Sequence, residues 1–140
     1  PNPGEPLKPL AKIASGGELS RIMLALKVLL AEADDVPLLV FDEVDTGIGG
    51  RALHAVAKKL SLLGKHRQVI CVTHSAQVAS HARAHHRIIK EFDGERTITR
   101  VELLDPAERL EELSRMLGGK DITDITRQHA SQLLRSAAKH

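Results

Sequence analysis

Two adjacent carboxylates, Asp42 and Glu43, directly follow the apolar run 37–41. A buried strand that ends in two acids places them where α/β sheets bind ligands, at the carboxyl end of a parallel strand. There Asp42 would contact Mg²⁺, mostly through water, because Mg²⁺ keeps much of its hydration shell. Glu43 would orient or deprotonate the water that attacks a γ-phosphate. The pattern therefore favours nucleotide hydrolysis over the alternative that both residues are solvated turn acids.

A second candidate site is the segment Ser15, Gly16, Gly17 and Glu18. The two glycines let the backbone approach a ligand closely, and the helix that follows presents free N–H groups and its positive dipole end to an anion. The same residues also fit a capping box, in which Ser15 caps the helix and Glu18 bonds back to it. The presence of the downstream carboxylates favours phosphate binding.

Asp45 and His74 complete the set of candidate residues. Asp45 precedes the glycine-rich turn 46–50, where it could cap the next helix or carry a loop towards a nucleotide bound by a dimer partner. His74 follows the apolar run 69–72, which we expect to be a strand parallel to the first. A histidine there can contact a γ-phosphate, although a local hydrogen-bonding role is the simpler alternative.

Hydrophobic periodicity and turn residues predict an α/β fold with a mostly parallel sheet flanked by helices and a terminal β-hairpin. The strand 38–41 has no polar alternation, so we expect it to be covered on both faces. The first helix has one apolar face, formed by Leu19, Ile22, Met23, Leu26, Leu29, Leu30 and Ala33. The expected elements are an edge strand or approach loop (7–14), this helix, the strand 38–41, a helix over 53–63, a strand (68–73), a short helix (76–82), two hairpin strands (87–92 and 97–103), and two helices (107–117 and 123–138).

Composition bounds the function classes without selecting one. The 140 residues suffice for one domain, and we expect residues 1–9 to be a linker or frayed end and 10–140 to fold. A net charge of +2 neither demands nor excludes a nucleic-acid partner, and two phenylalanines as the only aromatics argue against stacking on single-stranded bases. The single Cys71 fits a reducing, cytoplasmic compartment. No apolar stretch reaches the roughly 18–20 residues of a membrane span.

The sequence contains no Gly-x-x-x-x-Gly-Lys-Ser/Thr phosphate loop. An anion-seeking helix end and a pair of hydrolytic carboxylates therefore need phosphates that are held by another segment or another chain. We expect the chain to show no nucleotide turnover by itself.

Four segments resemble the RecN family, bacterial ATPases of DNA double-strand-break repair. Residues 12–27 are similar to its signature segment, 41–51 to its Walker B motif and D-loop, 72–79 to its switch-histidine segment, and 115–119 to a late helix. The resemblance extends from about residue 10 to 138. Ala14 stands where the general ABC signature has leucine, and Glu18 is shared with SMC-type ATPases.

This resemblance implies the C-terminal half of an ABC/SMC-type P-loop ATPase head that uses ATP and Mg²⁺. An N-terminal lobe of the same protein would supply the phosphate loop, and a second head would form an ATP-dependent homodimer. In that arrangement the segment 15–17 covers the nucleotide of the partner head. DNA would be a partner of the whole protein, located in the cytoplasm at the nucleoid. The implied site residues are Glu43 and His74 (catalytic), Asp42 (metal), and Ser15, Gly16, Gly17, Glu18 and Asp45 (nucleotide).

Three alternatives remain at this point. The chain could be a nucleotide-binding fragment of an ABC transporter or of another SMC-family protein, or a dimerisation module without catalysis. A coiled-coil heptad pattern upstream of the chain would favour the repair ATPase over a transporter.

Overall fold

The computed structural model describes residues 15–30, 36–119 and 121–139, and it divides into two compact units at the bond between Thr73 and His74. The predicted linker, the predicted strand or loop over 7–14, and Ala33 lie outside the described residues. The first unit contains α2 (Gly16–Leu29), β1 (Leu38–Asp42), α3 (Gly50–Leu63) and β2 (Gln68–Val72). The second contains α4 (Ala76–Ser80), β3 (His86–Phe92), β4 (Thr97–Leu103), α5 (Pro106–Gly118) and α6 (Asp124–Ala137).

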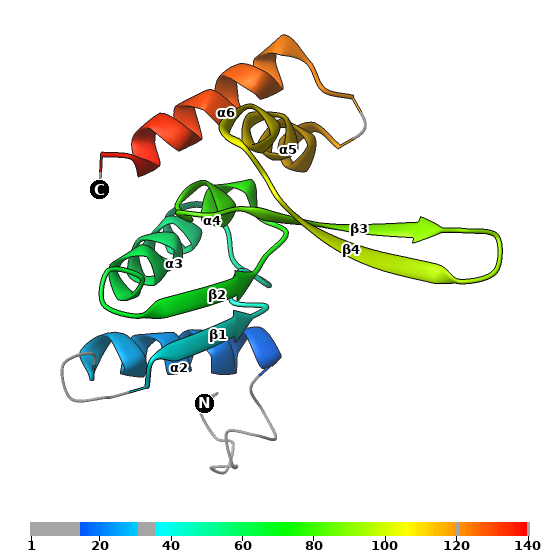
Figure 1. The fold of residues 1–140 in the computed structure, drawn as a ribbon. Helices are drawn as coiled ribbons and strands as arrows, with labels where there is room; N and C mark the ends of the chain where they lie inside the picture. The colour runs from blue at the N-terminus through cyan, green and yellow to red at the C-terminus, as the bar shows by residue number, and fades with distance from the viewer. Residues whose placement is uncertain (1–14, 31–35, 120, 140) are drawn as a thin grey trace, which may run out of the picture. The chain divides into compact units, whose positions relative to one another are not determined.

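In the first unit β1 and β2 form a parallel pair, in register from Leu38 opposite Gln68 to Asp42 opposite Val72. The helix α2 contacts β1, α3 contacts β2, and the two helices contact each other (Figure 1). The α/β class and the parallel pairing predicted from sequence are confirmed. Cys71 pairs with Phe41 across the strands, and burial raises the pKa of its thiol to about 12, as expected for a packing residue.

The prediction that β1 is covered on both faces is wrong. Leu39 and Phe41 are buried, whereas Val40, between them, is 63% exposed. Successive side chains of a strand point to opposite faces, so one face of this sheet is packed and the other is open. No described element of the first unit packs on the open face. We call this surface the open sheet face; its residues are Leu38, Val40, Ile70 and Val72.

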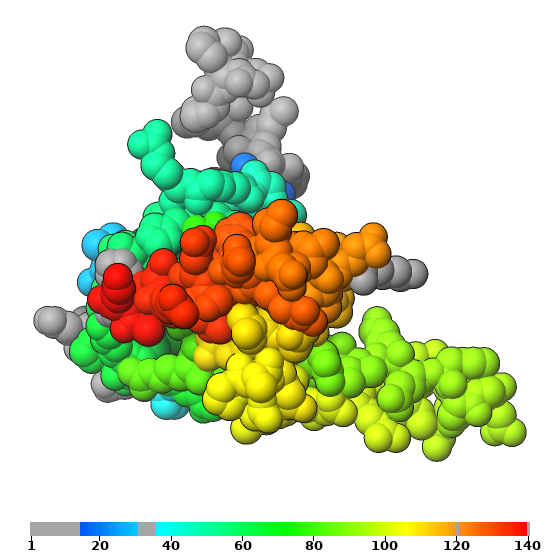
Figure 2. All heavy atoms as spheres, turned by 90° about the horizontal axis from the view of Figure 1, so that it is seen from above, coloured from blue at the N-terminus to red at the C-terminus, as the bar shows by residue number. Residues whose placement is uncertain are grey.

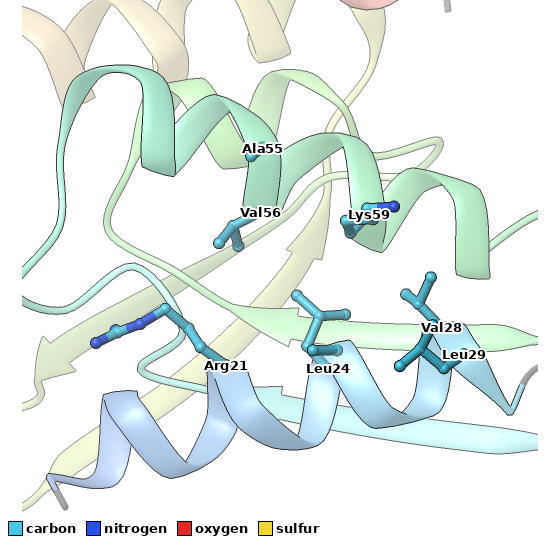
Figure 3. Close-up of a pocket in the computed structure, with 8 residues that line it drawn as sticks. Arg21, Leu24, Val28, Leu29, Ala55, Val56 and Lys59 are labelled. Carbon is cyan, nitrogen blue, oxygen red and sulfur yellow. The ribbon is translucent and has the colours of Figure 1, made fainter.

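The apolar face predicted for α2 also faces outwards. The buried residues of α2 are Gly17 and Leu24, and Leu24 points towards α3 across a groove of about 310 Å³ (Figure 3). The helix therefore packs through the row of residues 17, 21, 24 and 28, which lie at helical spacing. The residues of the predicted face that are described are all exposed: Leu19, Ile22, Met23, Leu26, Leu29 and Leu30.

The second unit combines a small helical core with a hairpin. The helices α4, α5 and α6 contact one another around buried Ala76, Ala79, Leu113 and Ala130. Arg109 of α5 donates to the carbonyls of Ala79, Ser80 and Ala82 at 2.6–3.0 Å, which satisfies the C-terminal end of the short helix α4.

The hairpin pairs β3 and β4 antiparallel from His86 opposite Leu103 to Phe92 opposite Thr97, and it extends as a long arm from the helices of its unit (Figures 1 and 2). The hairpin predicted from sequence is confirmed, and Asp93 and Gly94 lie in its turn. Asp93 Oδ1 accepts from the backbone N–H groups of Glu95 and Arg96 at 3.0 and 2.9 Å, and Gly94 has a φ of 99°. No helix within the described ranges is long and apolar enough to cross a membrane.

Candidate nucleotide site at the carboxyl end of β1

The two candidate carboxylates lie where the sequence predicts, at the end of β1. Asp42 is the last residue of the strand and Glu43 is the next residue, and both are exposed. Glu43 has a φ of 56°, in the left-handed region that residues other than glycine rarely adopt. The positive φ turns the backbone sharply at Glu43. Asp42 and Glu43 therefore occupy neighbouring positions at the carboxyl end of the sheet.

The turn that follows is closely packed. Thr46 N–H donates to the carbonyl of Glu43 at 3.0 Å, Val44 is fully buried, and Asp45 is 4% exposed. Asp45 Oδ2 accepts a hydrogen bond of 2.5 Å from Thr73 Oγ1, which joins this turn to the end of β2. The turn is therefore anchored to the strand segment that leads into His74.

The expectation that Asp45 caps the next helix is wrong. The N-cap of α3 is Gly49, which has no side chain to cap with, and Asp45 is directed instead towards Thr73.

Ser15 and Glu18 form the capping box at the start of α2. Ser15 Oγ accepts from Glu18 N–H at 3.3 Å, and Glu18 Oε2 accepts from Ser15 N–H at 2.8 Å. These hydrogen bonds to Ser15 lower the pKa of Glu18. Because the Ser15 hydroxyl only accepts in this box, its O–H can still donate to an anion. Capping and phosphate binding are therefore compatible functions of the same residue.

The glycines at the start of α2 lie against the carboxylate turn. A Cβ placed on Gly17 would be 2.7 Å from the carbonyl oxygen of Glu43, and one placed on Gly16 would be 2.9 Å from Glu43 Oε2. Glycine is thus required at position 17, where the neighbouring atom belongs to the backbone, whereas the contact at Gly16 is with the end of the flexible Glu43 side chain. The structure brings the segment 15–17 and Glu43 together in a single chain.

Arg21 makes a polar link between the same two segments. Its Nη1 donates to the carbonyls of Val44 and Thr46 at 3.3 and 2.8 Å. Sequence reasoning assigned no role to Arg21 or to Thr73. A signal for Arg21 is its position one turn after Gly17 on the packing row of α2, but that row is visible only once the partner of the helix is known.

His74 is the first residue of the second unit and is exposed. His74 directly follows Thr73, whose side chain donates a hydrogen bond to Asp45. The residue before His74 is therefore attached to the turn that carries Asp45. Ser75 caps α4 by accepting from Val78 N–H at 3.4 Å.

The donors fit a magnesium ion that is held mainly by water and phosphate. The described residues contain no group of three or more His, Cys, Asp or Glu side chains able to hold a metal ion. Mg²⁺ in phosphoryl-transfer sites uses one or two protein carboxylates, several waters and the substrate phosphates. Asp42, exposed at the end of β1, offers one such carboxylate.

The chain is similar in sequence to part of several known proteins. The chain is 50% identical over 138 residues to the DNA repair protein RecN of Treponema pallidum, 48% over 136 residues to that of Bacillus subtilis, and 51% over 133 residues to that of Deinococcus radiodurans. The chain is a relative of the RecN proteins. These alignments cover 95–99% of the chain but only 23–24% of each RecN protein, so the chain spans about a quarter of their length. No protein-family model matches.

The fold has a relative among solved structures. A chain from work on the ATP-driven dimerization and DNA-stimulated activation of SMC ATPases superposes with a TM-score of 0.57 over 84% of this chain and 70% of that one, at 20% identity. The fold of this chain therefore resembles that of this SMC ATPase chain. The RecN-like sequence and this fold do not favour the transporter alternative.

The packing of Gly17 predicts a specific cost. Gly17→Ala should destabilise the chain by about 1–3 kcal/mol, because its Cβ would overlap the backbone carbonyl of Glu43, which cannot move without moving the turn. The matched control is Gly64→Ala, whose Cβ would meet its nearest atoms at an ordinary 3.5 Å. Urea unfolding measures both, and equal stability of the two variants would contradict the packing.

Proposed function

We propose that this chain is the C-terminal lobe of the ATPase head of a RecN-type protein, which hydrolyses ATP with Mg²⁺ in DNA double-strand-break repair. One observation carries the proposal: the packing of Gly16 and Gly17 against Glu43 at the carboxyl end of β1, in a chain related to RecN. This packing joins a helix end suited to a partner's phosphate to a carboxylate suited to hydrolysis of the chain's own nucleotide.

The residues would divide the chemistry as follows. Asp42 binds the hydrated Mg²⁺, which neutralises charge on the transferred phosphoryl group. Glu43 accepts a proton from the attacking water or orients it. The Ser15 hydroxyl and the first N–H groups of α2 donate to phosphate oxygens, helped by the positive end of a helix of 14 residues. His74 contacts the γ-phosphate and Glu18 keeps Ser15 oriented through the capping box.

The N-terminal lobe with the phosphate loop is the first proposed partner. The open sheet face and the exposed face of α2 are large apolar surfaces for one small unit, and Val40 and Leu29 are 63% and 80% exposed. Parallel strands are normally buried on both faces, so two of them with one face bare form an incomplete sheet. The missing lobe would cover the open sheet face and complete it.

A second head is the other proposed partner. Ser15, Gly16 and Gly17 of one head would contact the γ-phosphate of a nucleotide bound to its partner, while Asp42, Glu43 and His74 act on the nucleotide of their own head. ATP then holds the dimer together, and hydrolysis releases it. Asp45 approaching the partner's nucleotide stays a prediction; its carboxylate would first have to leave Thr73. The solved SMC relative, from work on ATP-driven dimerization, supports this arrangement.

DNA is the proposed partner of the whole protein, and the cytoplasm, at the nucleoid, its proposed location. The names of the RecN relatives, which are DNA repair proteins, support the DNA partner. On the described surface, the side chains of Arg51, Lys58 and Lys59 on α3 have no ion pair with a described residue, which leaves them available for phosphates. The slope of DNA affinity against salt concentration for the complete protein would count such contacts.

The first test is Glu43→Gln in the complete protein. Removing a general base that also orients water should lower kcat for ATP about 10²- to 10⁴-fold, while Mg·ATP binding is retained. The matched control is Glu95→Gln, an acid in the hairpin loop, which should leave turnover unchanged. Steady-state ATPase assays and nucleotide-binding titrations measure the two effects. Turnover that persists in Glu43→Gln would rule out the proposed base.

The second test concerns the open sheet face. Val40→Lys should weaken association with the N-terminal lobe by about 10- to 100-fold, because burying valine contributes about 1.5–3 kcal/mol and the charge would have to be buried in its place. The control is Ile125→Lys on α6, an equally drastic change at a site that is 77% exposed. Titration calorimetry of the two lobes distinguishes them, and equal affinities would show that the lobe docks elsewhere.

A further inference from the structure

The beginning of α2 and the turn 43–46 are held together by one side chain. A single nitrogen of Arg21, Nη1, donates to the carbonyls of Val44 and Thr46, two residues apart on the turn. Figure 3 shows the Arg21 side chain leaving α2 at one end of the groove between α2 and α3. The bonds connect segments 23 and 25 residues apart in the chain, so they are tertiary links and not local helix contacts.

The turn needs support of this kind. Glu43 has a φ of 56°, a conformation that a non-glycine residue keeps only where the surrounding structure enforces it. Three contacts enforce it: the bonds from Arg21 on the α2 side, the close packing of Gly17, and the bond from Thr73 to Asp45 on the β2 side. Strained backbone of this sort recurs at functional sites, where it sets the direction of a reactive side chain.

We propose that Arg21 is a positioning residue that makes the phosphate-binding end of α2 and the Glu43 turn move as one body, and thereby couples the two ATP sites of a dimer. The proposal rests on the proposed function. There, the segment 15–17 of a head contacts the nucleotide of its partner, whereas Glu43 of that head acts on its own nucleotide. When the partner's phosphate engages Ser15, the displacement of α2 passes through Arg21 to Val44 and Thr46. Closure at one site thus sets the position of Glu43 at the other.

Arginine suits this role better than lysine. The guanidinium is planar and its donors have fixed directions, so it constrains the two carbonyls relative to each other. A lysine ammonium is a compact charge on a flexible stem that can hold one carbonyl but not fix the orientation of the turn. Partial function of Arg21→Lys is therefore expected, which separates a positioning role from mere filling of the groove.

The test uses the complete protein with Arg21→Met, which keeps an apolar stem against α3 and removes the charge, and Arg21→Lys. Arg135→Met is the matched control: it removes an exposed arginine of α6 that no part of the proposed site uses. Three quantities are measured: hydrogen exchange of the backbone amides of residues 44–46, kcat and KM for ATP, and the Hill coefficient of the ATPase.

Arg21→Met should speed exchange of these amides about tenfold or more. It should lower kcat about 10- to 100-fold through misplacement of Glu43, with KM changed by less than about threefold. The Hill coefficient should exceed one in the parent and fall towards one in Arg21→Met. Arg21→Lys should lie between Arg21→Met and the parent, and Arg135→Met should match the parent. If Arg21→Met does not fold, the same comparison rests on Arg21→Lys.

Unchanged exchange in both Arg21 variants would overturn the link itself. Faster exchange with unchanged kcat and Hill coefficient would reduce Arg21 to a structural residue and overturn the coupling. Failure of the proposed function is recognised separately, because it appears as ATP turnover that persists in Glu43→Gln. The exchange measurement tests the link whether or not Glu43 is the base.

Discussion

The close approach of α2 to the turn after β1 is the constraint on which the site depends. It is possible only because Gly17 has no side chain, since a Cβ there would lie 2.7 Å from the carbonyl of Glu43. With that contact in place Arg21 can reach the carbonyls of Val44 and Thr46, and the turn can hold Glu43 at a positive φ. Gly16 and Gly17 therefore shape the carboxylate end of the sheet, besides the phosphate contact proposed for them. Packing and chemistry at this point use the same residues.

The first unit has more apolar surface than its own elements cover. One face of the sheet and one face of α2 are exposed, and both consist of large aliphatic side chains. Exposed apolar area on this scale marks an interaction surface. The same unit carries the candidate carboxylates. The surface proposed to bind another lobe therefore lies on the same unit as the site proposed to act on the nucleotide held by that lobe. Val40 of the open sheet face is two residues before Asp42, the last residue of β1. A lobe docked on this face would therefore lie close to the carboxyl end of the strand.

The helices and strands could be predicted to within a few residues because local chemistry defines many of their ends. Asp105 and Thr123 cap α5 and α6, the Asp-Gly pair turns the hairpin, and Ser15 with Glu18 begins α2. The candidate residues Asp42 and Glu43 were also identified from local pattern alone. The burial of apolar side chains was predicted less well. An apolar run indicates that a surface needs a packing partner, but it does not indicate which chain supplies that partner. Val40 and the outer face of α2 are exposed for that reason.

The links that hold the site were not predictable in the same way. Arg21 and Thr73 act on residues 23–28 positions away, and nothing in their immediate sequence indicates those partners. For Asp45, the local sequence suggested a role that the structure does not show. It was expected to cap the following helix, but the N-cap is Gly49 and Asp45 accepts a tertiary hydrogen bond from Thr73. Local pattern identified the groups that can do chemistry, while tertiary contacts decide how each is held.

The division of the site between two heads is tested most directly by mixing two inactive forms of the complete protein. One form carries Ser15→Arg, which blocks the phosphate-facing end of α2, and the other carries Glu43→Gln. In a mixed dimer one nucleotide meets an intact Ser15 from one head and an intact Glu43 from the other, so ATP hydrolysis should reappear on mixing. The double variant mixed with either single variant should stay inactive. If the two single variants also remain inactive when mixed, although mixed dimers form, Ser15 and Glu43 serve the same nucleotide from one chain and the division between heads is wrong.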